Sequence, residues 1–283
     1  MINLLTTIDE NWLPYACMML ASVRRTTSES ISCWVLHGNI PQAQTQRVRK
    51  WASEKSIEVV FVHIDDLGLA PPGETKWTRA ALWGRYLVSE VVPSSITRCI
   101  YLDVDIVATR PLDKLMNVDL KGKPVGAVTC PAPHVARRLG LSESEYFNNG
   151  LLVVDTRRFD GRAYISRMQE YLKRPDLEFG PQCAFSLGAQ GDVATLEKKW
   201  NVLGEYRAEW SAKAHVIHFT GDVKPWHYLS PDPLRPLVHD LIQTTPFPEA
   251  WEPDRTAGKV LRRMLRSVRN PGRHALVRKA SEP

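Results

Sequence analysis

Two aspartates follow a short apolar run in the middle of the chain. Asp103, Val104 and Asp105 come directly after the residues CIYL at 99–102 and are followed by two more apolar residues. In an extended segment, residues two apart point to the same face, so both carboxylates can share one hard cation and bridge it to a diphosphate. Such a triplet also occurs in solvated turns. Here, however, two unpaired acids in apolar surroundings would be costly, so we predict a divalent metal site.

A second group of polar residues lies in the sequence HFTGDVKPWH at 218–227. His218, which ends a short apolar run, can offer a neutral imidazole to a metal. Gly221 lets the backbone approach a phosphate, and Lys224 supplies a point charge for it. A histidine on such a run can equally be a structural, hydrogen-bonded residue. The group is consistent with a diphosphate site beside the metal.

The elements that carry these residues alternate between strands and helices. The pattern predicts strands at 3–7, 31–37, 57–64, 98–102, 125–129, 150–154 and 216–219, and helices at 12–26, 42–54 and 78–91. Alternation of this kind predicts a mostly parallel central sheet flanked by helices and built from right-handed βαβ units. In open sheets of this class, ligands bind beyond the carboxyl ends of the strands, where Asp103 and Asp105 are expected to lie.

The length and composition indicate one large α/β domain with an appendage. The chain has 283 residues, of which 43% are hydrophobic. We predict a catalytic domain at 1–250 and a basic tail at 251–283. The start shows no signal-peptide pattern, and no run approaches the roughly 20 apolar residues of a spanning helix. Five scattered cysteines predict reduced thiols and a cytoplasmic protein.

The tail concentrates positive charge. The whole chain carries +6, but residues 255–283 hold nine basic residues and one acidic residue, which is +8, and leave −2 for the rest. Apolar residues from Val260 to Val268 recur at helical spacing among arginines. We predict a helix, over 256–269, that lies on the anionic inner face of the cell membrane, so that the protein is peripherally associated with it. The alternative is a basic helix docked on the enzyme body. No RNA-binding module is evident, and we expect no nucleic-acid partner.

Three motifs together resemble a known family. Asp103-x-Asp105, the run FNNGLLVVD at 147–155, and His218-x-x-Gly221-x-x-Lys224 followed by Pro-Trp are similar in order and spacing to those of glycosyltransferase family 8. That family comprises retaining enzymes, among them lipopolysaccharide galactosyl- and glucosyltransferases and glycogenin. The resemblance spans about residues 2–226. It implies a GT-A fold (a Rossmann-like sheet), a UDP-sugar donor, manganese or magnesium, and net retention at the anomeric carbon.

The resemblance also implies roles for individual residues. It assigns Asp103, Asp105 and His218 to the metal, and Gly221 and Lys224 to the diphosphate. Uracil and ribose would be held after the first strand, next to an aromatic residue, and other residues would contact the donor sugar or its phosphates. Thr7, Asp9 and Asn11 match the uracil and ribose positions, and Trp12 matches the aromatic position after them. Arg85 matches a contact to the donor phosphate or sugar, Asn148 matches a donor-sugar contact, and Val104 and Gln182 complete the expected donor site. Arg85 is also compatible with an ordinary surface position on a helix.

One position departs from the family pattern. Family members usually carry a sugar-binding aspartate immediately before the glutamine that matches Gln182, and another shortly after it. This chain has Pro181 and Cys183 there. The change affects the expected donor sugar more than the expected reaction, because the metal and diphosphate chemistry does not use that carboxylate.

The predicted reaction is the transfer of a hexose from a UDP-sugar to a saccharide or lipid-linked saccharide in bacterial cell-surface glycan assembly, of the lipopolysaccharide or capsule type. The metal and Lys224 would stabilise the leaving UDP. Without an evident carboxylate nucleophile, same-face attack through an ion pair is expected, with Gln182 as a dipole near the anomeric carbon. Two alternatives remain: a nucleotidyltransferase, although the residues at 6–11 are acidic rather than basic and glycine-rich, and a non-catalytic sugar-nucleotide-binding protein, which Pro181 makes credible.

Overall fold

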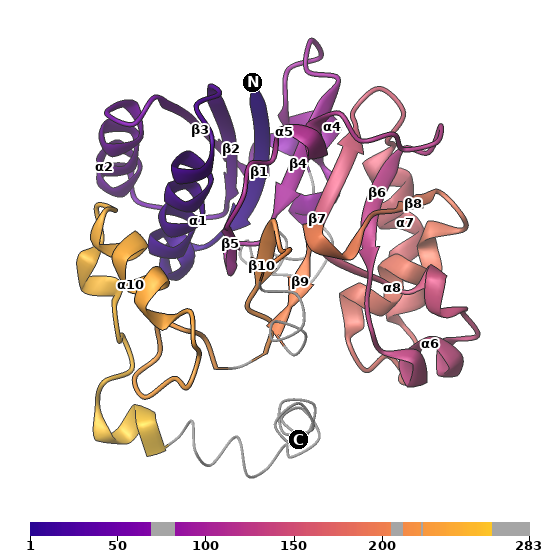
Figure 1. The fold of residues 1–283 in the computed structure, drawn as a ribbon. Coiled ribbons are helices and arrows are strands. Elements are labelled where there is room, and N and C mark those ends of the chain that lie inside the picture. The colour runs from indigo at the N-terminus through magenta and orange to yellow at the C-terminus, as the bar shows by residue number, and fades with distance from the viewer. Residues whose placement is uncertain (69–82, 205–211, 222, 262–283) are drawn as a thin grey trace.

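The first 63 residues of the chain consist of repeated strand–helix units. The computed structural model describes residues 1–68, 83–204, 212–221 and 223–261, and Figure 1 shows their arrangement. The first elements are β1 (Ile2–Ile8), α1 (Leu13–Thr26), β2 (Ile31–His37), α2 (Gln42–Ser53) and β3 (Ile57–His63). All five predicted elements in this region are therefore confirmed, each within two residues of its expected limits.

The rest of the described chain has shorter and more varied elements. The remaining strands are β4 (Arg98–Leu102), β5 (Ile106–Ala108), β6 (Val125–Thr129), β7 (Phe147–Asp155), β8 (Val193–Thr195), β9 (Val202–Leu203) and β10 (Val216–His218). The remaining helices are α4 (Val88–Val91), α5 (Asp113–Met116), α6 (Pro133–Leu139), α7 (Gly161–Leu172), α8 (Gly180–Ala189) and α10 (Arg235–Gln243). The strands β5, β8 and β9 were not predicted; strands of two or three residues show little periodicity, although β10, of similar length, was predicted at 216–219.

The central sheet has seven strands in the order β3-β2-β1-β4-β7-β6-β8. The pairs β3–β2, β2–β1, β1–β4 and β6–β8 are parallel, whereas β7 runs antiparallel to both β4 and β6. The prediction of a mostly parallel sheet flanked by helices is therefore confirmed. The strand order reverses between β1 and β4, which is the place where ligands bind in sheets of this kind.

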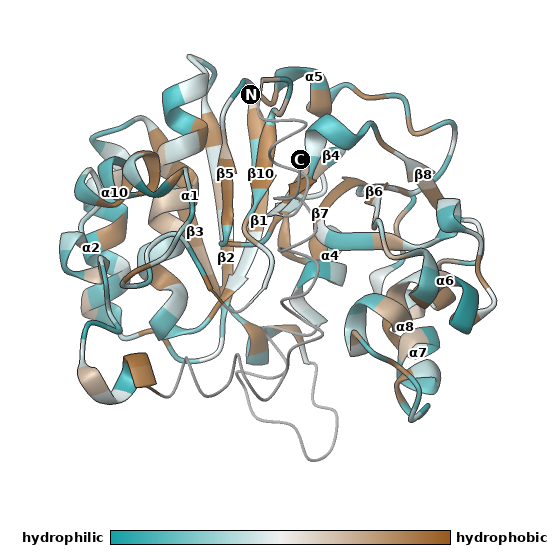
Figure 2. Ribbon diagram, turned by 60° about the horizontal axis from the view of Figure 1, so that its bottom comes forward, coloured by the Kyte–Doolittle hydropathy of each residue, from teal (hydrophilic) through white to brown (hydrophobic). Residues whose placement is uncertain are grey.

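The two faces of the sheet pack against different helices. Along β1, Leu4 belongs to a core that includes residues of α1, α2 and α10, whereas its neighbour Leu5 belongs to a second core with α7 and α8. Along β4, Ile100 and Tyr101 are divided in the same way. Figure 2 shows the apolar strands between these two helical layers. Alternate side chains on opposite faces are the expected consequence of a strand buried on both sides.

A small second sheet lies against the first. Its order is β5-β10-β9, with β5 antiparallel and β9 parallel to β10. Residues 103–105 form the turn through which the chain leaves β4 and enters β5. This sheet therefore brings the end of β10, a strand more than one hundred residues later in the sequence, next to the carboxyl end of β4.

The helix predicted at 78–91 is confirmed only in part, because its described residues form two short helical pieces and not one helix. Residues 69–82 lie outside the described residues. After Trp83, residues Gly84–Tyr86 form a 3-10 turn, and Leu87 separates it from the four-residue α4. A Cβ on Gly84 would lie 2.3 Å from Thr7 Cγ2, so the turn needs a glycine, which is itself a poor helix former. Close approach to β1 thus outweighs the helical pattern here.

The start of the predicted tail is joined to the body of the protein. The ring of Trp251 packs against the core, and the guanidinium of Arg235 lies 4.4 Å from its centroid. Glu252 donates its backbone N–H to the carbonyl of Trp226 (3.0 Å) and forms a salt bridge with Arg235. Residues 257–261 are helical, and the remainder of the predicted tail helix, at 262–269, lies outside the described residues. Among the helices that are described, none is long and apolar enough to cross a membrane.

The close contact between α7 and the 3-10 turn at 84–86 gives a first prediction. A Cβ on Gly161 would lie 1.6 Å from the carbonyl oxygen of Tyr86, so Gly161→Ala must displace the backbone. We expect it to lower the free energy of unfolding by about 1–3 kcal/mol in urea denaturation. The control is Gly188→Ala in α8, whose Cβ would make an ordinary 3.5 Å contact with Met168. The control should raise stability by up to about 1 kcal/mol, and equal effects would contradict this packing.

Candidate functional site

The predicted metal and donor residues surround one cavity at the carboxyl ends of β1 and β4. Its volume is about 250 Å³. The first strand and the turn after it supply one side, and the turn between β4 and β5 supplies the other. The lining residues are Thr7, Ile8, Asp9, Trp12, Arg85, Tyr101, Asp103, Val104 and Asp105. Six residues predicted as part of the donor site, and the predicted aromatic Trp12, therefore share this cavity.

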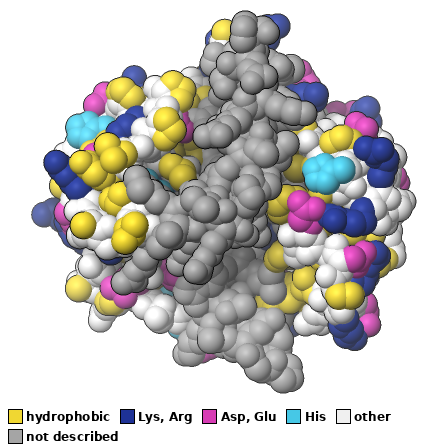
Figure 3. Space-filling model, turned by 90° about the horizontal axis from the view of Figure 1, so that it is seen from below, with side chains coloured by type: hydrophobic (Ala, Val, Ile, Leu, Met, Phe, Trp, Pro, Cys, Tyr) yellow, Lys and Arg dark blue, Asp and Glu magenta, His cyan; other side chains and the backbone are white. Residues whose placement is uncertain are grey.

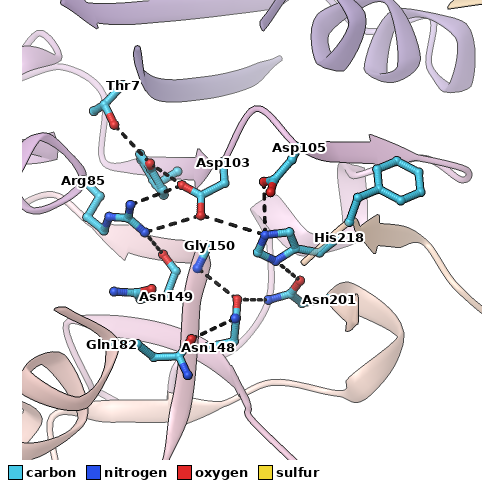
Figure 4. A network of polar contacts seen from close by, with 12 residues as sticks. Thr7, Arg85, Asp103, Asp105, Asn148, Asn149, Gly150, Gln182, Asn201 and His218 are labelled. Atoms are coloured by element: carbon cyan, nitrogen blue, oxygen red, sulfur yellow. Dashed lines mark hydrogen bonds and ion pairs between the residues drawn. The ribbon is translucent and has the colours of Figure 1, made fainter. Parts of the chain in front are cut away.

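Asp103 is held from several directions (Figure 4). Its backbone N–H donates to the carbonyl of Gly150 (2.8 Å), and its Oδ1 accepts the hydroxyl of Tyr101 (2.6 Å). Because Tyr101 gives its only proton to a carboxylate, the 3.1 Å contact with Thr7 has the Thr7 hydroxyl as the donor. Tyr101 lies two residues before Asp103, on the same side of the strand. Sequence reasoning missed its role, although the period-two spacing was a usable signal.

Arg85 binds the same carboxylate from the 3-10 turn at 84–86. Its guanidinium lies 3.4 Å from Asp103 Oδ1, donates to the carbonyl of Asn149 (2.8 Å) and covers the ring of Tyr101. Burial alone would lower the pKa of Arg85, but the negative charge of Asp103 raises it above its ordinary value. Its side chain is 14% exposed, so the alternative of an ordinary surface arginine does not hold.

Asp105 lies on the other side of the turn and is paired with Lys224. Lys224 Nζ donates to Asp105 Oδ2 (2.6 Å) and to the carbonyl of Phe219 (2.5 Å). Burial would raise the pKa of Asp105, but the positive charge of Lys224 lowers it well below its usual range. The carboxylate is therefore held in its ionised form, which is the form that binds cations. In this structure the positive charge of Lys224 is directed to Asp105.

His218 ends β10 with a ring that is almost fully buried. Its Nε2 lies 3.1 Å from Asp105 Oδ1 and 3.9 Å from Asp103 Oδ2. One ligand atom from each of these three residues lies within 4.8 Å of the other two. A Cβ on Gly150 would come within 2.2 Å of the His218 ring, so the ring can approach β7 only because residue 150 is a glycine. The three residues that the sequence assigned to a metal are thus brought together.

The donor atoms of this cluster suit a divalent cation. Two carboxylates favour a hard ion, while a neutral imidazole is an accepted ligand of first-row transition metals. The side chains of Asp103 and Asp105 are 25% and 16% exposed, so the cluster opens to the cavity and leaves coordination positions for further oxygens. The cluster therefore fits the ion that the resemblance implies.

The turn after β1 is stabilised by its own side chain. Asp9 is buried and accepts the backbone N–H groups of Asn11 (2.8 Å) and Trp12 (3.2 Å) through Oδ1. Asn11 is exposed and does not line the cavity. The ring of Trp12 contacts the ring of Tyr15, and Tyr15 stacks on Trp226 with 4.1 Å between the ring centroids. This group joins the turn to the segment that carries Lys224.

Gln182 and Asn148 form a separate polar group beside the cluster of Asp103, Asp105 and His218. Asn148 donates to Gln182 Oε1 (2.9 Å), and Gln182 Nε2 donates to the hydroxyl of Tyr146 (3.0 Å). Asn148 Oδ1 accepts two hydrogen bonds, so at most one N–H of this side chain remains for a ligand. Pro181 sits in the first turn of α8, a position where proline is well tolerated.

Two residues that contact the predicted site residues were not themselves predicted from the sequence. Asn201 contacts both His218 and Asn148, and Tyr146 contacts Gln182. Neither belongs to a recognisable motif, because each acts only through contacts made by the folded chain. Gly221 has a φ of +90°, which only glycine adopts readily, in agreement with its expected backbone role. The neighbouring residue 222 lies outside the described residues.

Comparisons with known proteins agree with this architecture. The sequence profile of glycosyl transferase family 8 matches residues 3–230, and the chain belongs to this family. A probable galacturonosyltransferase-like protein 4 of Arabidopsis thaliana is 27% identical over 84% of this chain and 76% of its own. A lipopolysaccharide 1,2-glucosyltransferase of Escherichia coli K12 is 21% identical over 80% of this chain and 73% of its own.

A solved structure confirms the fold. The galactosyltransferase LgtC, crystallised with donor and acceptor sugar analogues, matches with a TM-score of 0.72. It is 18% identical in sequence, and the match covers 86% of this chain and 96% of that one. The GT-A fold that the family resemblance implied is therefore confirmed.

The Thr7–Tyr101–Asp103 contacts lead to a second prediction. Tyr101→Phe removes a hydrogen bond to a carboxylate and leaves the Thr7 hydroxyl without this acceptor. We expect the free energy of unfolding to fall by about 1.5–3 kcal/mol in urea denaturation. Tyr171→Phe, a half-buried tyrosine of α7, is the control and should change it by far less. A Tyr101→Phe variant as stable as the unmodified protein would show that this hydrogen bond does not stabilise the fold.

Proposed function

We propose that this protein is a metal-dependent retaining glycosyltransferase that transfers a hexose-type sugar from a UDP-sugar to a saccharide or lipid-linked saccharide. The observation that carries the proposal is the cluster of Asp103, Asp105 and His218 beside the cavity at the carboxyl ends of β1 and β4. Membership of glycosyltransferase family 8 supports the transfer of a glycosyl group.

The cavity is suited to a nucleotide with its diphosphate directed at the cluster. The turn at residues 7–12 offers polar and aromatic groups, in particular Thr7, Asp9 and Trp12, for a base and a ribose. Arg85 and Lys224 provide positive charge at the end where the two aspartates lie. We therefore place the uracil and ribose by the turn, with Asn11 at its rim, and the diphosphate by Asp103, Val104 and Asp105.

The proposed ion is Mn²⁺ or Mg²⁺, held by Asp103, Asp105 and His218. When bound, it would offset the negative charge that develops on the leaving diphosphate. Mixed carboxylate and imidazole donors suit Mn²⁺ better than Mg²⁺, which prefers oxygen ligands and retains more of its water.

The side chains of the protein contribute orientation and charge. Lys224 forms a hydrogen bond with Asp105 and is close enough to the cluster to supply its charge to a diphosphate. The backbone at Gly221 would approach the same diphosphate. We assign Gln182 to the reacting face, where its amide dipole lies near the anomeric carbon. Its orientation is fixed by hydrogen bonds with Asn148 and Tyr146. Stabilisation by preorganised groups of this kind is a large part of catalysis in such sites.

The proposed biological role is the assembly of a bacterial cell-surface glycan of the lipopolysaccharide or capsule type. It is supported by the similarity to the Escherichia coli lipopolysaccharide glucosyltransferase. The similarity to a plant galacturonosyltransferase-like protein, together with Pro181 in place of the usual sugar-binding aspartate, makes the transferred sugar the most open element of the proposal.

A turnover measurement distinguishes the proposed enzyme from the non-catalytic alternative. Family membership argues against a nucleotidyltransferase. A sugar-nucleotide-binding protein would bind UDP but would release none from any UDP-sugar. Incubation with a panel of UDP-hexoses, UDP-hexuronic acids and UDP-N-acetylhexosamines in the presence of Mn²⁺ distinguishes the two, and NMR of the product would show whether the anomeric configuration is retained.

The metal assignment gives a third prediction. We expect Mn²⁺ to strengthen UDP binding at least about tenfold over binding in EDTA, which is about 1.4 kcal/mol, as measured by isothermal titration calorimetry. Asp105→Ala should abolish this gain. Asp119→Ala, an exposed aspartate before β6, is the control and should retain it. Equal UDP affinities with Mn²⁺ and with EDTA would contradict the assignment.

We also propose that the basic C-terminal segment attaches the protein to the anionic inner face of the cell membrane. On the face shown in Figure 3, lysine and arginine side chains of the described residues are interspersed with acidic and apolar ones. The concentrated charge lies in the sequence after residue 255, with eight basic residues against one acidic residue. Each basic residue near an anionic surface contributes roughly 1 kcal/mol, so several suffice for reversible attachment.

A fourth prediction concerns the removal of the tail. Because residues 251–255 contact the body of the protein, the truncation should begin after residue 255. Removing residues 256–283, which carry a net charge of +7, keeps Trp251 and Glu252 in place. We expect the shortened protein to remain folded, to bind UDP with Mn²⁺ and to lose sedimentation with phosphatidylserine vesicles. Added salt should weaken binding of the full chain, because charges are screened within about 10 Å at 0.1 M. Vesicle binding that survives the truncation would contradict the role of the tail.

A further inference from the structure

The His218 ring is held on both of its nitrogens. Nε2 faces the two carboxylates, and Nδ1 lies 3.2 Å from Oδ1 of Asn201. Asn201 directly precedes β9, and β9 pairs with β10 so that Leu203 is opposite His218. The side chain of Asn201 therefore reaches the ring from the neighbouring strand of the small sheet. Figure 4 shows the ring between the aspartates and Asn201.

The direction of this contact follows from one backbone group. The N–H of Gly150 can only donate, and it donates to Asn148 Oδ1 (3.0 Å). The Asn201 atom that meets the same oxygen at 2.8 Å must also be a donor, so it is Nδ2. The oxygen of Asn201 then faces His218, and Nδ1 must carry the proton. Asparagine orientation and histidine tautomer are thus assigned from the hydrogen-bond pattern.

Burial makes this arrangement difficult to reverse. Asn148, Asn201 and His218 are 6%, 2% and 4% exposed. Turning any one of them would place two acceptors or two donors against each other in a site without access to water, and each buried group left unsatisfied costs about 1–3 kcal/mol. The Nδ1–H tautomer leaves a lone pair on Nε2, which lies 3.1 Å from Asp105 Oδ1 and 3.9 Å from Asp103 Oδ2, so these acceptors face one another until a positive charge lies between them. A cation between these atoms satisfies all three.

We propose that Asn201 is a positioning residue that fixes His218 in the Nδ1–H tautomer and so prepares Nε2 to bind the metal. Asn148 acts behind it by fixing the orientation of the Asn201 amide. The part that concerns the metal rests on the proposed function, whereas the part that concerns the tautomer does not. Groups that orient a ligating histidine commonly alter metal affinity by about 10- to 100-fold when they are removed.

The same series of hydrogen bonds extends to the proposed reacting face. Asn148 Nδ2 donates to Gln182 Oε1, so Gln182 must donate from Nε2 to Tyr146. The orientation of the Gln182 amide and the tautomer of His218 are therefore both determined by the Gly150 N–H. Asn148 thus connects the proposed metal-binding residues to Gln182. At most one N–H of its side-chain amide remains to bind the donor.

The test measures the tautomer directly. Full-length protein labelled with ¹⁵N-histidine would be studied by NMR in EDTA at alkaline pH, with His218→Gln to assign the signal. We expect the proton of His218 on Nδ1, although free histidine favours Nε2–H in water. In Asn201→Leu the proton should move to Nε2, whereas Asn201→Asp, which keeps an acceptor, should retain it on Nδ1. A proton on Nε2 in the unmodified protein, or on Nδ1 in Asn201→Leu, would overturn the proposal.

A second measurement separates positioning from general stability. We expect Mn²⁺ affinity, measured by calorimetry, to fall about 10- to 100-fold in Asn201→Leu. The matched control is Asn3→Leu, a buried asparagine at the start of β1 that donates to the carbonyl of Arg98, and it should leave the affinity unchanged. If Asn201→Leu does not fold, the tautomer of the unmodified protein still decides the proposal. If the unmodified protein has the Nδ1–H tautomer but does not bind Mn²⁺, the metal site is refuted and the role of Asn201 stands. If it binds Mn²⁺ tightly but has its proton on Nε2, the role of Asn201 is refuted and the metal site stands.

Discussion

The structure is organised around the close approach of two carboxylates and one imidazole, whose ligand atoms lie within 4.8 Å of one another. Negative charge gathered in a poorly solvated place must be offset. In the described chain, Lys224 and Arg85 each bind one of the aspartates. Arg85 and Lys224 are far apart in the sequence. The ion pairs that offset the two aspartates therefore connect the middle of the chain to its C-terminal part.

The fold meets this requirement through two sheets that share one turn. The chain leaves the central sheet at Leu102 and joins the small sheet at Ile106, and the aspartates lie between these two points. Backbone hydrogen bonds fix both ends, from Asp103 to Gly150 and from Phe219 to Asp105. The site is therefore built on strand ends of two sheets and not on a free loop, which favours precise geometry.

The sequence predicted the parts of this arrangement that depend on local periodicity. The strand–helix units of the first 63 residues, the strand before Asp103 and the strand that ends at His218 were all anticipated. The antiparallel placement of β7 and the 3-10 turn at Arg85 were not, because each depends on contacts with segments far away in the sequence. The proposed metal-binding residues could be recognised from their motif, whereas Tyr101 and Asn201 have contacts that only the folded chain defines.

The most direct test of this account is the position of a bound metal ion. Crystals grown with Mn²⁺ and UDP, measured on both sides of the manganese absorption edge, would locate the ion by its anomalous scattering. The account predicts a single strong peak in contact with Asp103, Asp105 and Nε2 of His218, with the diphosphate on its open side. An ion bound elsewhere, or a UDP molecule in the cavity with no manganese at these three residues, would contradict it.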